Sequence, residues 1–155
     1  MERQGNNLGL SILGALLAAV VGGAIWAIIA IVSDYEIGIV AWGIGGLAGY
    51  LVYQFAKGSI TALHQIIAVV GSIFGIILGK YFILGYFYNY ESVSGMFQSD
   101  TMSVFADEFT VLFSGMDFVF ILLAVVTAWQ LPVQLMQKAV QKRPVIESPT
   151  ESAAE

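Results

Sequence analysis

The 155-residue chain contains no cysteine and carries little charge. Without cysteine, a disulfide framework, a thiolate metal site, an iron–sulfur cluster and a cysteine nucleophile are excluded. Charged residues make up 11% of the chain, against about 25% in an average soluble domain. The six Lys and Arg residues form no basic stripe, so we expect no nucleic-acid partner.

The sequence also lacks the motifs that carry common enzyme chemistry. It has no nucleophile–base pair, P-loop, zinc-binding helix motif or dinucleotide fingerprint. The Gly-rich stretch at 43–46 lies inside an apolar run, with no preceding strand and no phosphate-binding lysine. We therefore predict a protein that is not an enzyme, with no catalytic residue, no metal and no cofactor.

Long apolar runs are abundant, and hydrophobic residues make up 58% of the chain. Four runs, at 8–32, 37–56, 62–84 and 118–136, are each long enough to cross a bilayer as a helix. They are apolar on both faces, unlike the alternating strands of a membrane barrel. These features predict an all-α membrane protein with four transmembrane helices in residues 1–143, followed by a disordered cytoplasmic tail at 144–155.

The positive charges predict an orientation, because Lys and Arg concentrate on the cytoplasmic side. With the N-terminus inside, the inner segments hold Arg3, Lys57, Lys138, Lys142 and Arg143, and the outer side holds only Lys80. We expect both termini to be cytoplasmic and Lys80 to snorkel to the outer interface. Asp34 and Glu36 are expected to mark solvent at the first outer turn, and Asp117 to be the N-cap of the last helix.

The segment at 85–116, between the third and fourth spans, is expected to lie outside. Helical spacing of apolar residues predicts a short amphipathic helix of about 14 residues there, too short to span. Its apolar face is a possible outer contact surface, composed of Met102, Phe105, Phe109 and Phe113. Such a helix either lies passively at the membrane surface or forms a lid or docking element.

Small residues recur at four-residue spacing on three of the predicted helices, and positions four apart share one helix face. The helix-packing candidates are Gly14, Ala18 and Gly22; Ala41, Gly45 and Gly49; and Gly71, Gly75 and Gly79. Close approach of helices over small residues stabilises membrane bundles. Packing within one chain is one interpretation of these stripes, and homo-oligomerisation is the other. The lone His64 is expected to be structural.

The segment from Gly14 to Lys80 resembles a known pattern. A small-residue helix containing Trp26 precedes Tyr35-Glu36-Ile37-Gly38, a Gly-rich helix follows, and Leu78-Gly79-Lys80-Tyr81 closes the segment. This order is similar to that of a widespread family of small bacterial multi-pass membrane proteins that has no assigned activity. The resemblance implies a bacterial cell (inner) membrane. The zinc ribbon of some relatives does not transfer, because the chain has no cysteine.

Together these features predict a non-enzymatic integral membrane protein, a small scaffold or accessory subunit packed through glycine stripes. Its partners would be the lipid bilayer and either a second copy or another membrane protein. The alternative is an oligomeric pore or small-solute permease, which the glycine stripes would also suit.

Overall fold

The structure is a computed structural model, and it describes residues 7–142. Its elements are α1 (Leu8–Ser33), α2 (Ile39–Phe55), α3 (Ala62–Tyr88), the 3-10 helix η1 (Val93–Phe97), α4 (Ser99–Asp107), α5 (Phe109–Leu112) and α6 (Gly115–Gln141). Within the described residues there is no strand, and the predicted all-α class is confirmed. The predicted tail at 144–155, like Arg3 and Arg143, lies outside the described residues.

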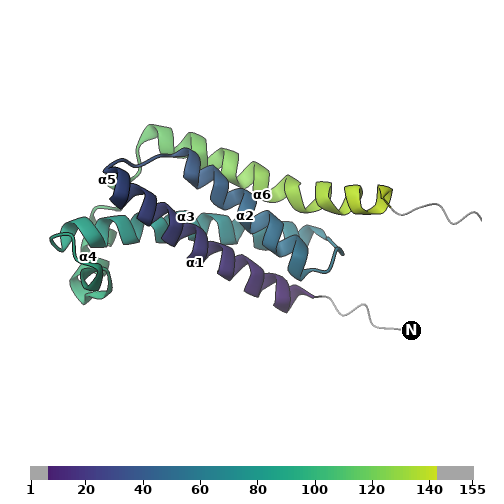
Figure 1. The fold of residues 1–155 in the computed structure, drawn as a ribbon, viewed down its shortest axis with the longest axis horizontal. Coiled ribbons are helices and arrows are strands. Elements are labelled where there is room, and N and C mark those ends of the chain that lie inside the picture. Colours follow the sequence, from purple (N-terminus) through teal and green to yellow (C-terminus); the bar gives the residue numbers. More distant parts are fainter. Residues whose placement is uncertain (1–6, 143–155) are drawn as a thin grey trace, which may run out of the picture.

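Four helices, α1, α2, α3 and α6, lie side by side and alternate in direction (Figure 1). α1, α3 and α6 have 26, 27 and 27 residues and are long and apolar enough to cross a membrane. α2 is also apolar but has 17 residues, and at 1.5 Å per residue it is about 26 Å long. We call the two ends of this bundle the Lys80 end and the His64 end, after residues of α3 near each.

The outward faces of the long helices carry large apolar side chains. On α1 these include Leu13, Val20 and Ile28, and on α6 Val119, Leu122 and Val126, all exposed. In water such surfaces would be an aggregation hazard, whereas in lipid they are the expected exterior.

The third and fourth apolar helices are longer than the sequence predicts. α3 continues to Tyr88, and α6 begins at Gly115 and runs past Pro132 to Gln141. The predicted N-cap at Asp117 is wrong, because Ser114 is the N-cap and Asp117 is the third helical residue. Each side chain of this pair bonds the other's backbone N–H, which forms a capping box.

α1 and α3 pack closely because small residues face each other along both helices. A methyl group at Gly71 would lie 2.7 Å from Ala15 Cβ, and one at Gly75 would lie 2.9 Å from Ala19 Cα. From the other side, a methyl group at Gly23 would lie 2.9 Å from the carbonyl oxygen of Gly75. The predicted stripe of α3 therefore faces residues 15, 19 and 23 of α1. This line lies beside the predicted stripe of α1, which begins at Gly14.

The other predicted stripes also face helices of the same chain. On α1, Gly14 contacts Leu51 and Gly22 contacts Ile44, both on α2. On α2, Gly45 lies against the backbone of α6 at Ala124, and Gly49 faces α6 at Leu131 and Pro132. Ala18 and Ala41 are buried as well.

These contacts predict opposite outcomes for two glycines of α2. Gly45→Ala places a methyl group 2.6 Å from Ala124 Cα, and overpacking of this kind typically costs about 1–3 kcal/mol. Gly43→Ala is the matched control, because a methyl group there has no neighbour within 4 Å. Thermal unfolding in detergent should show a lower midpoint for Gly45→Ala and a slightly higher one for Gly43→Ala, because alanine is the more stable residue in a helix interior. Equal midpoints would contradict the close α2–α6 contact.

Candidate functional site

The most unusual side chain of the bundle is Lys80, which is 1% exposed. The prediction that it snorkels to the interface is wrong. α3 continues for eight residues beyond it, which places its backbone about 12 Å from the helix end. Its position beside Gly79 and one turn after Ile76 is on the buried face of α3. A buried ammonium group of this kind must be paired to be stable.

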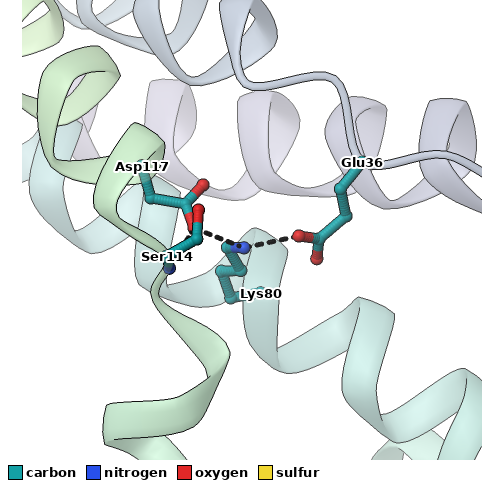
Figure 2. Close-up of polar contacts among 4 residues, drawn as sticks. All are labelled: Glu36, Lys80, Ser114 and Asp117. Carbon is teal, nitrogen blue, oxygen red and sulfur yellow. Dashed lines mark hydrogen bonds and ion pairs between the residues drawn. The ribbon is translucent and has the colours of Figure 1, made fainter.

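Two carboxylates from distant segments supply that pairing (Figure 2). Lys80 Nζ donates to Glu36 Oε2 at 2.5 Å and to Asp117 Oδ2 at 3.2 Å. Glu36 lies in the connection between α1 and α2 and is 39% exposed, whereas Asp117 lies in the first turn of α6 and is 12% exposed. One lysine therefore ties together three parts of the chain at the Lys80 end.

Asp117 is held in place by its own helix. Its Oδ2 accepts hydrogen bonds from Ser114 N at 2.7 Å and from Ser114 Oγ at 3.0 Å, in addition to the one from Lys80 (Figure 2). A carboxylate in the first helical turn is also stabilised by the helix dipole. Asp117 thus completes the capping box of α6 and pairs with Lys80 through the same oxygen atom.

Aromatic rings cover other sides of the ammonium group. Lys80 Nζ lies 5.5 Å from the Trp26 ring centroid and 5.6 Å from that of Phe113. Both distances are within the range of cation–π attraction. We call Lys80, Glu36, Asp117, Trp26 and Phe113 the Lys80 cluster. Its one positive and two negative groups are arranged for pairing.

Among residues 7–142, the second fully buried ionisable side chain is that of His64, at the opposite end of α3. It is buried, and its Nδ1 lies 2.8 Å from Thr61 Oγ1 and 3.2 Å from Thr61 N, completing the capping box that begins α3. Its Nε2 has no hydrogen-bond partner among residues 7–142. Within the same range, no three His, Asp or Glu side chains are grouped closely enough to hold a metal ion.

The segment that joins α3 to α6, residues 89–114, holds the four residues of the predicted outer contact surface. In place of one amphipathic helix it contains η1, α4 and α5, with a break at Glu108. Met102 is 60% exposed, but Phe105 is 7% exposed and stacks edge-on against Tyr81. Phe109 is exposed, whereas Phe113 packs on the core and on Lys80. The four residues therefore do not share one exposed face.

Polar contacts that sequence reasoning missed hold the α3–α6 connection together and join it to α3. Asn89 Nδ2 lies 3.0 Å from the carbonyl oxygen of Gly95 and 2.9 Å from Thr101 Oγ1. Thr101 Oγ1 donates to the same carbonyl of Gly95 at 2.8 Å, and Tyr81 Oη donates to Met96 O at 2.8 Å. No sequence motif marks this group, because its members come together only when the chain folds back onto α3.

Comparison of the chain with protein-family models, with curated proteins and with solved structures gives no match.

The Lys80 cluster predicts a specific loss of stability. Lys80→Met leaves Glu36 and Asp117 without their cation. We expect the free energy of unfolding to fall by about 3 kcal/mol, the low end for breaking a buried ion pair, because Glu36 is partly exposed. The measurement is reversible unfolding in mixed micelles.

Lys138→Met is the matched control, because Lys138 is exposed on α6, and its effect should stay within about 0.5 kcal/mol. Adding Asp117→Asn to Lys80→Met should restore part of the loss by removing the unpaired charge. If Lys80→Met unfolds like Lys138→Met, the ion pairs do not stabilise the bundle.

Proposed function

We propose that this chain is a four-helix integral membrane protein of the bacterial cell (inner) membrane and acts as a small non-enzymatic scaffold or accessory subunit. Both termini are cytoplasmic, and the Lys80 end faces outward. The resemblance of the Gly14–Lys80 segment to small bacterial membrane proteins agrees with this location.

The direction of the helices supports α2 as the fourth span. α1 and α3 run in the same direction (Figure 1), so a chain that crosses the membrane in both must return between them. α2 is an apolar helix between them and runs in the opposite direction, which supports it as the return span. Its length of about 26 Å falls slightly short of a hydrocarbon core of about 30 Å, a mismatch that local thinning accommodates.

The distribution of charge supports the orientation. Lys57, Lys138 and Lys142 lie at the His64 end, whereas Asp34 and Glu36 lie at the Lys80 end. Lysines concentrate on the cytoplasmic side of membrane proteins.

One observation carries the proposed role: the buried lysine and the small residues of the bundle contact other residues of the same chain. The ammonium group of Lys80 is neutralised by Glu36 and Asp117, and the predicted glycine stripes face helices of the same chain. Because the stripes are covered within one chain, they are less available to the alternative, an oligomeric pore assembled over those stripes. The exposed apolar side chains of the α3–α6 connection, Phe97 and Met102 among them, are the surface available to a partner.

The orientation predicts a pattern of cysteine labelling, for which the cysteine-free chain is a clean background. Ser94→Cys, exposed in the α3–α6 connection, should react with a membrane-impermeant maleimide in intact cells. Ser59→Cys, exposed in the connection between α2 and α3, should react only after permeabilisation. The reverse pattern would overturn the topology.

The scaffold role predicts a defined contact at the α3–α6 connection. A photo-crosslinking residue at Met102 should give one discrete adduct with another membrane protein in living cells. The matched control is Tyr35, which is also exposed at the Lys80 end and should give no such adduct. Adduct formation at Met102 should fall at least about tenfold when Phe97→Ser is added, the change expected for the loss of about 1.4 kcal/mol of binding.

Adducts of equal yield at positions 35 and 102, or none at position 102, would contradict the proposed contact surface. Reconstituted vesicles that show solute flux would favour the pore instead.

A further inference from the structure

Two carboxylates lie at the end of α4 where a helix favours positive charge. Asp107 is the last residue of α4, and Glu108 is its C-cap. The helix dipole places partial negative charge at a C-terminus, so anionic side chains are unfavourable there. Glu108 does not offset this by capping α5, because its side chain makes no cap hydrogen bond. These two acids therefore do not stabilise the helix that they end.

The described part of the chain also supplies no cation to them. The sequence has no Lys, Arg or His from 81 to 137. Both ion pairs found among residues 7–142 use Lys80, which is already paired with two carboxylates. The three other lysines of that range lie at the His64 end, whereas α4 lies at the Lys80 end (Figure 1). The exposed acids of the α3–α6 connection are Glu91, Asp100, Asp107 and Glu108.

α4 presents an apolar flank and an acidic flank side by side. It turns Thr101 and Phe105 inward. At about 100° per residue, its outward face has Met102 on one side and Asp100 and Asp107 on the other, all of them exposed. A partner that lies along this face would contact an apolar side chain and carboxylates at the same time.

A strained pair of residues presents further groups near this face. Tyr90 has a φ of 56° and Glu91 has a φ of 60°, in the left-handed region that is uncommon for residues other than glycine. The preceding residue, Asn89, bonds Thr101 Oγ1 at 2.9 Å, which places the pair near the first turn of α4. The Tyr90 side chain is 98% exposed. Such backbone strain clusters at ligand clamps and other functional sites.

We propose that the outward face of α4 binds a basic segment of the membrane-protein partner. Lys or Arg side chains of that segment would pair with Asp100, Asp107 and Glu108, and an apolar side chain would pack on Met102. The inference rests on the proposed scaffold role and specifies the chemistry of its partner. A cation at the C-terminal end of α4 is favoured both by the carboxylates and by the helix dipole. Complementary charge of this kind gives an interface specificity and a faster association rate.

Other occupants fit this face less well. A metal ion needs several ligands at one point, and no three His, Asp or Glu side chains of residues 7–142 are grouped closely enough to hold one. Anionic lipid headgroups are repelled by the carboxylates. A second copy in the same orientation would present the same acidic face, because its lysines of the described range, apart from the buried Lys80, lie at the His64 end.

The test combines the photo-crosslinking residue at Met102 with neutral variants of the acids. Asp107→Asn with Glu108→Gln should lower the yield of the Met102 adduct by about fivefold, the effect of losing two exposed ion pairs. Removing anions from a helix C-terminus should not lower the unfolding midpoint, so a loss of adduct is not a loss of fold. Asp34→Asn is the matched control and should keep the yield, because Asp34 is an exposed acid at the Lys80 end outside the α3–α6 connection.

Two further measurements address the chemistry of the partner directly. Raising NaCl from about 50 to about 500 mM in isolated membranes should lower the wild-type yield, because salt screens exposed charges. Mass spectrometry should find Lys or Arg in the crosslinked peptide of the partner. Equal yields for the neutral variant and Asp34→Asn, or a crosslinked peptide without basic residues, would overturn the basic partner and leave the contact surface in place. Absence of any adduct at position 102 would contradict the scaffold role as well.

Discussion

The ammonium group of Lys80 needs counter-charges in a place from which it cannot reach water. A lysine near a helix end satisfies its charge by extending to the interface, but α3 continues two turns past this one and its inward face is already packed. The chain instead brings the carboxylates of Glu36 and Asp117 to the lysine. Because those residues lie before α2 and at the start of α6, their pairing sets where two other helices begin relative to α3.

Small residues determine the rest of the arrangement. Where glycine and alanine face each other, helix backbones meet and dispersion contacts are dense. The chain concentrates such pairs at the α1–α3 and α2–α6 contacts, which Gly75 and Gly45 illustrate. It leaves isoleucine and phenylalanine between α3 and α6. An apolar groove remains where these larger side chains line the α3–α6 contact.

The helical class and the three long apolar helices could be predicted from uninterrupted apolar runs, because their length alone separates them from strands and turns. The burial of Lys80 could not be predicted. Whether a lysine snorkels or is buried depends on where its helix ends and on which face of the helix points inward, and the sequence shows neither. The same limit applies to α1. Its two lines of small residues, beginning at Gly14 and Ala15, are one residue apart, and only the packed structure assigns the second to α3.

Attachment of the α3–α6 connection to α3 bears on what that segment can do. A loose loop at a membrane surface loses conformational entropy whenever a partner orders it. Here Asn89, Thr101 and Gly95 are already joined by hydrogen bonds, and Phe105 stacks on Tyr81. Met102 is consequently presented from a segment that is largely ordered before any partner arrives. A scaffold benefits from such a surface, because little ordering cost then opposes association, whereas a lid would need the same hydrogen bonds to break at each opening.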